Sequence, residues 1–289
     1  MTLGNEHFHV EVTTPMTGCM AEYGPRFETL GAVTGVRLDG MSFLAREGLI
    51  DEFNIQATLS PSGYDAAQAG DPFMKIGVGE LLREDDQPYD FSHPYTIRQM
   101  APVHAEQRNG EIVFTQSLRT ETGWGYDYCK TYQVLPDAAT LVIEYRLKNT
   151  GLHPIHAEQY NHNWFNFGGD PVNDGYSMLS KFDIEEDGSG WVERQGERLD
   201  VIGRLAEPCY FASPHPAPAH TNWLHLRHAD RGCAVAVSGD FDMARFALYA
   251  DQSAVCPEVF FQTQLAPDES KTWKRIYEFQ NQSAASLAK

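Results

Sequence analysis

The residues with the clearest chemical potential lie together in the run Asn161-His162-Asn163-Trp164. An imidazole that titrates near neutral pH stands here between two amides and next to an indole ring. Aromatic faces stack on the C–H edges of sugars, amides bind hydroxyl groups, and an imidazole can move a proton. We therefore expect Asn161, Asn163 and Trp164 to contact a sugar and His162 to carry a proton. The residues alone leave open a core histidine bonded to the backbone.

A second candidate is Glu258, which stands in the apolar run Val255-Cys256-Pro257-Glu258-Val259-Phe260-Phe261. Glutamate is rarely buried without a partner or a chemical role. Burial also raises the pKa of a carboxyl group towards the range that suits a general base. The alternative is a glutamate on an edge strand that faces water.

Two further residues are candidates for substrate binding. His93 precedes Pro94 at the end of a loop and offers a second imidazole, and Lys75 could donate hydrogen bonds to sugar hydroxyls. A surface position is the alternative for each of them.

Four potential metal ligands are close in the sequence: His153, His156, Glu158 and His162. Alternate residues of a strand share a face, so the last three could point the same way if no bulge intervenes. The set resembles a cupin ligand group loosely, but the spacing differs and no later histidine completes it. We therefore expect no metal site.

The amino-acid composition is typical of a folded protein and argues against several classes of function. The chain has 289 residues, of which 12% are aromatic and 21% are charged, and its net charge is −18. This charge repels polyanions, so we expect no nucleic-acid partner. No apolar run approaches the roughly 20 residues of a membrane helix, and the N-terminal residues do not resemble a secretory signal. The five cysteines form no Cys-x-x-Cys pair, so a cytoplasmic protein with reduced thiols is expected.

The elements that must position these residues are predicted to be strands. Residues 141–148 alternate between apolar and polar side chains, which is typical of a half-buried antiparallel strand. Asn149-Thr150-Gly151 then predicts a hairpin turn into the strand that carries His162. Asp39-Gly40 predicts another hairpin. Residues 46–71 show no clear periodicity and are expected to form a long loop, which is often functional.

No helical period, repeat or convincing linker interrupts this pattern. Many short strands with frequent turns predict an all-β sandwich or barrel. We expect a single domain over residues 1–289.

Two segments resemble one known family. Residues 161–166 resemble the Asn-His-Ser/Thr-Tyr-Phe-Asn element of the galactose mutarotase (aldose 1-epimerase) family. Residues 265–269 resemble its closing Leu-x-Pro-Gly-Glu turn, with Asp268 in place of the glycine. The resemblance implies an antiparallel β-supersandwich, with His162 as the general acid and Glu258 as the general base. It also implies no cofactor.

The chain departs from the family pattern in one region. The family's second histidine follows a glycine-rich segment that contains an arginine, whereas residues 73–79 and His93 stand in that place here. Lys75 is the nearest cation, and the His-Gly-Gly element is missing. These departures indicate a divergent member.

The expected function is that of an aldose 1-epimerase, which interconverts the α and β anomers of a free or modified aldose. The expected partner is a small-molecule sugar, bound by a monomer or homodimer. Two alternatives remain open. One is a non-catalytic carbohydrate-binding domain, and the other is a lyase or glycoside-processing enzyme on the same fold.

Overall fold

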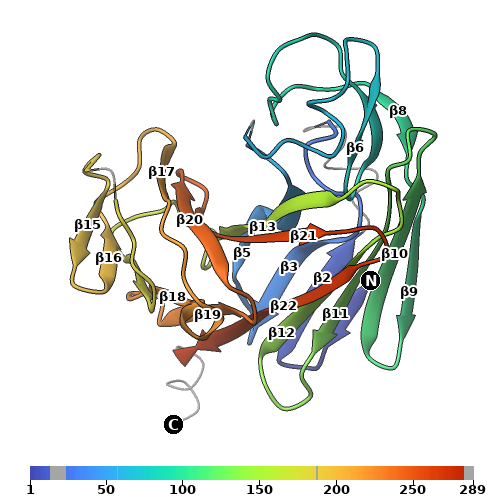
Figure 1. Ribbon diagram of the computed structural model, residues 1–289. Coiled ribbons are helices and arrows are strands. Elements are labelled where there is room, and N and C mark those ends of the chain that lie inside the picture. Colours follow the sequence, from blue (N-terminus) through green and yellow to red (C-terminus); the bar gives the residue numbers. More distant parts are fainter. Residues whose placement is uncertain (14–23, 57, 187, 283–289) are drawn as a thin grey trace.

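The computed structural model describes residues 1–13, 24–56, 58–186 and 188–282, and their regular structure is almost entirely antiparallel β-sheet. Figure 1 shows two large sheets facing each other, with a small third sheet above one end. The expected all-β, antiparallel sandwich is confirmed. Among the described helices, none has the length and apolar character needed to cross a membrane.

The first sheet has the strand order β1-β2-β3-β5-β13-β21-β20-β17. The short strand β4 also belongs to this sheet and pairs with β3. Its strands are β1 (Thr2–Gly4), β2 (Phe8–Thr13), β3 (Ala32–Leu38), β4 (Met41–Ser42), β5 (Leu44–Phe53), β13 (Ile155–Phe165), β17 (Cys209–Ser213), β20 (Met243–Ala250) and β21 (Val255–Leu265).

The second sheet has the order β15-β16-β14-β18-β19-β22-β12-β11-β10-β9. Its strands are β9 (Val103–Arg108), β10 (Glu111–Arg119), β11 (Gly125–Val134), β12 (Thr140–Asn149), β14 (Tyr176–Ser180), β15 (Val192–Gln195), β16 (Arg198–Val201), β18 (Trp223–His228), β19 (Cys233–Gly239) and β22 (Ser270–Asn281).

The third sheet contains β6 (Pro72–Lys75), β7 (Gly79–Leu82) and β8 (Ile97–Met100). One short 3-10 helix, η2 (Ala219–Thr221), lies in the proline-rich connection before β18.

The main core lies between the two large sheets and follows from the alternation of the strands. On β12 the side chains of Leu141, Ile143, Tyr145 and Leu147 are fully buried, as the sequence predicts. Their hydrophobic burial is the dominant favourable term in holding the sheets together.

Two turns behave as their sequences predict. Asp39 and Gly40 both have positive φ, at 48° and 80°, and join β3 to β4. Two consecutive positive φ angles give the turn the twist that an antiparallel hairpin needs. At the turn between β21 and β22, Asp268 takes the glycine-like conformation with φ 67°.

The expected hairpin at Asn149-Thr150-Gly151 is wrong. The strand before it, β12, belongs to the second sheet, and the strand after it, β13, belongs to the first. The segment therefore crosses from one sheet to the other. The side-chain amide of Asn149 stabilises the crossing, because it donates to the carbonyl oxygens of His153 and Leu265.

The expected long loop over residues 46–71 is also wrong in its first part. Residues up to Phe53 form β5, a central strand of the first sheet that pairs with β13. Its periodicity is hidden because Asp51 and Glu52 occupy two fully buried positions. Such positions are normally apolar, and these two carboxylates are tolerated because each has a cationic partner.

Candidate active site

The site lies on the outer face of the first sheet, where β13 runs between β5 and β21. Along β13, successive side chains point to opposite faces. Tyr160 and His162 point outward, and Asn161 and Asn163 point towards the second sheet. Both faces of this strand are buried over most of its length, so the outward side chains lie beneath covering segments.

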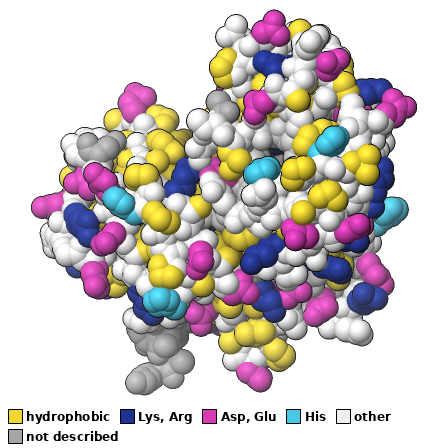
Figure 2. Space-filling view, viewed as in Figure 1, with side chains coloured by type: hydrophobic (Ala, Val, Ile, Leu, Met, Phe, Trp, Pro, Cys, Tyr) yellow, Lys and Arg dark blue, Asp and Glu magenta, His cyan; other side chains and the backbone are white. Residues whose placement is uncertain are grey.

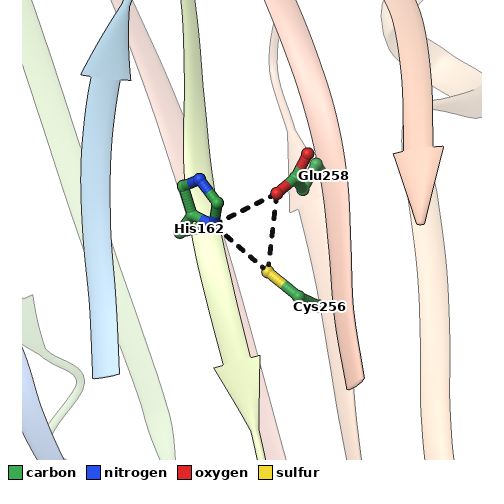
Figure 3. Close-up of side chains that lie close together, drawn as sticks. All are labelled: His162, Cys256 and Glu258. Carbon is green, nitrogen blue, oxygen red and sulfur yellow. Dashed lines mark hydrogen bonds and ion pairs between the residues drawn. The ribbon is translucent and has the colours of Figure 1, made fainter. Parts of the chain in front are cut away.

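His162 and Glu258 are in direct contact. Nδ1 of His162 lies 3.1 Å from Oε1 of Glu258, and both side chains are more than nine-tenths buried. Figure 3 shows the imidazole on β13 and the carboxylate on β21 pointing towards each other, with Cys256 next to them. The thiol of Cys256 is 3.7 Å from each of these two atoms.

The other imidazole nitrogen, Nε2 of His162, also has partners. It forms a hydrogen bond with the Tyr160 hydroxyl, which in turn donates to Oε2 of Glu52 at 2.5 Å. A guanidinium nitrogen of Arg26 lies 3.1 Å from Nε2. Together these groups hold the plane of the imidazole and connect it to a buried carboxylate.

Glu52 is the anionic centre of this arrangement. Burial acts to raise its pKa, but the hydrogen bond with His162 and the charges of Lys75 and Arg26 outweigh burial, so the pKa is lowered. Nε of Arg26 lies 3.1 Å from Oε2 of Glu52. Glu52 is therefore expected to be ionised at neutral pH.

Lys75, which was expected to bind substrate, is buried beside Glu52. Its Nζ lies 3.9 Å from Oε1 of Glu52 and donates to the Tyr89 hydroxyl at 2.8 Å. Burial lowers the pKa of Lys75 to about 8, although the charge of Glu52 acts in the opposite direction. The charged form of this lysine therefore still predominates at pH 7, although by much less than for an exposed lysine.

The pKa of Glu258 is shifted in the opposite direction from that of Glu52. Burial raises its pKa, the charge of Glu52 adds to that rise, and His162 offsets part of it. A carboxylate with a raised pKa accepts a proton more readily. The two carboxylates around His162 thus differ in the ease with which they can be protonated.

Aromatic rings frame His162. The indole of Trp164 stacks on the imidazole at 5.6 Å with an interplanar angle of 12°, and the Phe27 ring meets it edge-on at 5.1 Å. Trp164 is half-buried, as is Arg26, whereas His162 is only 7% exposed. Nε1 of Trp164 and Oε1 of Glu52 are buried without a hydrogen-bond partner among the described residues.

The amides of Asn161 and Asn163 do not face this site, which differs from the expectation that both contact a sugar. Asn161 donates to Asp51 at 3.1 Å. Asn163 donates to the Pro257 carbonyl at 2.7 Å and accepts from the Tyr277 hydroxyl at 3.0 Å. Because they neighbour His162 in a strand, they must point to the opposite face.

His93 has partners elsewhere. Its Nε2 lies 2.9 Å from Glu84, and its ring packs against Tyr95 at 4.5 Å, in the segment around the third sheet. Among the described residues, His93 makes no contact with those around His162, so it lies outside the candidate site.

The four residues considered as metal ligands do not gather. His153 packs against Trp124, and His156 is exposed. Glu158 binds Arg245 in a two-point ion pair. Within the described part of the chain, a different group has ligand-like spacing: His162, Cys256 and Glu258.

Sequence reasoning missed Arg26, Glu52, Tyr160 and Cys256. Tyr160 could have been found, because it is two residues from His162 and so shares its face of the strand. Glu52 was missed because its strand was taken for a loop. Arg26 is 136 positions from His162 in the sequence, and no local pattern indicates that the two residues are in contact.

The comparisons with known proteins concern the fold. The sequence matches no protein-family profile and no curated protein. A galactose mutarotase-like protein from Lactobacillus casei ATCC 334 is similar in structure, with a TM-score of 0.58 and 12% identity over 97% of this chain and 99% of that chain. A galactose mutarotase related enzyme from Lactobacillus acidophilus has a TM-score of 0.58 and 10% identity over 97% of each chain.

A third similar structure is the GalM/aldose epimerase homologue from C. elegans, with a TM-score of 0.50 and 12% identity over 89% of this chain and 96% of that chain. At these identities the likeness shows the fold alone. The chain has the galactose mutarotase-like fold, and the expected resemblance is confirmed at that level.

Proposed function

We propose that the protein is an isomerase of the aldose 1-epimerase type, which interconverts the α and β anomers of a free or modified aldose. One observation carries the proposal. His162 and Glu258, a proton donor and a proton acceptor, meet at 3.1 Å on the outer face of a mutarotase-like β-sandwich. Because a fold alone does not define an activity, this pair is the main support.

The chemistry needs one base and one acid at the anomeric carbon. Glu258 takes the proton of the C1 hydroxyl while His162 gives a proton to the ring oxygen, and the C1–O5 bond breaks. Both oxygens are bonded to the same carbon, so two groups that contact each other can each reach one of them. After rotation about C1–C2, the reverse proton transfers close the ring to the other anomer.

The raised pKa of Glu258 supports its assignment as the base, since general bases work best when their pKa is near the working pH. Glu52 and Tyr160 support His162 from the opposite side of the imidazole. We assign these two as positioning residues, which keep the ring fixed while its proton moves.

The surroundings suggest what the sugar would meet. The half-buried indole of Trp164 offers a flat face for C–H groups, and no described residue accepts a hydrogen bond from its Nε1. Arg26 and Lys75 place two cations beside Glu52 within a protein of net charge −18. Figure 2 shows acidic side chains spread over the visible surface, so an anionic sugar would depend on these two cations for binding. Uronic acids and sugar phosphates therefore belong among the test substrates.

The test is anomer exchange, measured by magnetisation-transfer NMR with neutral aldoses, uronic acids and sugar phosphates. Wild-type protein, His162→Ala and Glu258→Gln are compared at equal concentration, and circular dichroism confirms that the variants fold. We expect exchange above buffer that is lost in both variants. Absence of exchange with every sugar, or exchange that survives in both variants, would refute the proposal.

One observation favours a second candidate, a non-catalytic carbohydrate-binding domain. Both imidazole nitrogens of His162 already have protein partners, and its side chain is only 7% exposed. A sugar must displace one of those partners before proton transfer begins. Sugar binding detected by calorimetry, without exchange in the NMR experiment, would select this second function.

A further inference from the structure

The group formed by His162, Cys256 and Glu258 has a feature that proton transfer in the proposed reaction does not use. The thiol of Cys256 is fully buried and lies beside the contact between His162 and Glu258, 3.7 Å from an atom of each. Nothing in ring opening requires a sulfur atom. A nitrogen, a sulfur and a carboxylate oxygen, however, are the three ligand types that Zn²⁺ takes in proteins.

The distances within this group suit one tetrahedral ion. Ligand bonds of about 2.0–2.3 Å at tetrahedral angles separate the ligand atoms by roughly 3.3–3.5 Å. Here the separations are 3.1 Å for Nδ1 of His162 to Oε1 of Glu258, and 3.7 Å from Sγ of Cys256 to each. Shifts of a few tenths of an ångström would bring all three atoms to one metal ion.

The surrounding hydrogen bonds would also suit a metal site. A ligating histidine normally uses its second ring nitrogen in a hydrogen bond that leads to a carboxylate, which fixes the ring. Nε2 of His162 contacts the Tyr160 hydroxyl, and this hydroxyl donates to Glu52. The backbone N–H of Asn163 also donates to the Cys256 sulfur at 3.1 Å. These hydrogen bonds therefore already orient His162 and Cys256.

Charge balance also favours a dication. A thiolate at Cys256 and a carboxylate at Glu258 would together carry two negative charges, which a divalent ion neutralises in this buried place. The cations Arg26 and Lys75 oppose metal binding, but both lie on the Nε2 side of the imidazole, against Glu52. Their ion pairs with Glu52 reduce that opposition.

We propose that His162, Cys256 and Glu258 bind one thiophilic divalent cation of the Zn²⁺ type, with a fourth position left to water or another ligand. The Sγ–metal bond replaces the S–H bond, and the thiol proton passes to solvent. This site differs from the expectation of no metal site. That expectation rested on His153, His156, Glu158 and His162, which are close in the sequence, and did not include Cys256.

A consequence for activity follows and rests on the proposed function. The ion would occupy Nδ1 of His162 and Oε1 of Glu258, the atoms through which the proposed acid and base meet, so Zn²⁺ would inhibit anomer exchange. Metal binding itself is measured without any reaction, so a failure of one proposal is distinguishable from a failure of the other.

The experiment titrates the metal-free full-length protein with Co²⁺ and follows the thiolate-to-cobalt charge-transfer absorption. Zn²⁺ affinity is then measured by competition with a chelating dye. The variants are Cys256→Ser and a matched control, Cys233→Ser, which removes another buried thiol on β19 of the second sheet. We expect one metal per chain and a charge-transfer band in wild type and Cys233→Ser. Cys256→Ser should lose the band and bind Zn²⁺ at least about tenfold more weakly.

The proposal is overturned if wild type shows no charge-transfer band, or if the band persists in Cys256→Ser. X-ray absorption of the zinc-loaded wild type needs no variant and decides the matter if Cys256→Ser does not fold. One sulfur at about 2.3 Å with nitrogen and oxygen at about 2.0–2.2 Å supports the site. A shell of nitrogen and oxygen alone overturns it.

Discussion

Two clusters of buried charge lie on opposite faces of the first sheet. The inner cluster consists of Glu28, Asp51 and Lys130, between the two sheets, and Nζ of Lys130 lies 2.6 Å from Oε1 of Glu28. The outer cluster consists of Arg26, Glu52, Lys75, His162 and Glu258. Neighbouring residues of β5 supply both clusters, with Asp51 in the inner one and Glu52 in the outer one.

The difference between the clusters lies in how completely their members are enclosed. In the inner cluster, Asp51 and Lys130 have no solvent exposure and form an ion pair, and Tyr145 and Asn161 add hydrogen bonds to Asp51. In the outer cluster, the Arg26 side chain is 25% exposed. The inner groups are fully enclosed by protein, whereas the outer cluster borders solvent through Arg26. This access to solvent is why we place the candidate site in the outer cluster.

The largest expected effect is on stability, at the centre of the inner cluster. Lys130→Met leaves the buried carboxylates Asp51 and Glu28 without their cation. Removing one partner of a buried ion pair costs about 3–5 kcal/mol, so we expect a loss of that size in the free energy of unfolding, measured with urea. Lys271→Met, at an exposed position of β22, is the control and should change stability little. Equal stabilities of the two variants would contradict the role given to the inner cluster.

In the outer cluster, the corresponding substitution is expected to lower activity and to leave stability almost unchanged. Glu258→Gln removes the proposed base while keeping the shape of the side chain, so anomer exchange should fall about 10²–10⁴-fold. Because burial raises the pKa of Glu258, a neutral amide is tolerated there, and the free energy of unfolding should change by less than about 1 kcal/mol. A large loss of stability with retained exchange would show that Glu258 stabilises the fold and does not act in the reaction.

A third prediction concerns the pH dependence of stability through Lys75. Its pKa is lowered from 10.5 in the unfolded chain to about 8 in the fold. Between these values the folded state binds fewer protons than the unfolded state, so this lysine makes stability rise with pH across the window, by roughly 3 kcal/mol. Below pH 8 its unfavourable contribution is fully present. Urea titrations of wild type and Lys75→Met from pH 7 to above 10 should show a flatter profile in the variant, and parallel profiles would argue against the assignment.

The smallest effect is expected at Tyr160, whose hydroxyl connects Glu52 to His162. Tyr160→Phe removes the hydrogen bonds of this hydroxyl with the ionised Glu52 and with His162, which should lower the free energy of unfolding by about 1–2 kcal/mol. If Tyr160 positions the imidazole, the pH profile of exchange should also shift. A stability change without any shift in that profile would mark Tyr160 as structural only.

Local patterns were enough to predict the all-β fold but not its connections. The alternation on β12 and the turn at Asp39-Gly40 depend on neighbouring residues, and both predictions hold. The choice of sheet after Asn149 depends on partners far along the chain, so a turn signal could not show that the chain crosses to the other sheet. β5 was missed because ion pairs, formed only in the fold, allow Asp51 and Glu52 to be buried.

The candidate site shows the same limit. The residues pointed to His162 and Glu258, and the structure places them in contact. Asn161 and Asn163 were grouped with His162 by sequence proximity, although strand geometry turns adjacent side chains to opposite faces. Cys256 stands two residues before Glu258 and so shares its face, but its importance depends on β13 lying beside β21.

The strand order of the first sheet also bears on how the chain folds during synthesis. β5 pairs with β13, and β13 pairs with β21, so the centre of this sheet forms only after Leu265 has been made. Proteins dominated by such distant pairings fold slowly, because loop closure costs entropy before the contacts form. Until then the growing chain exposes an unpaired edge on β13, which is prone to wrong association. We therefore expect refolding from denaturant to be slow and sensitive to protein concentration, with aggregation increasing when β21 is deleted.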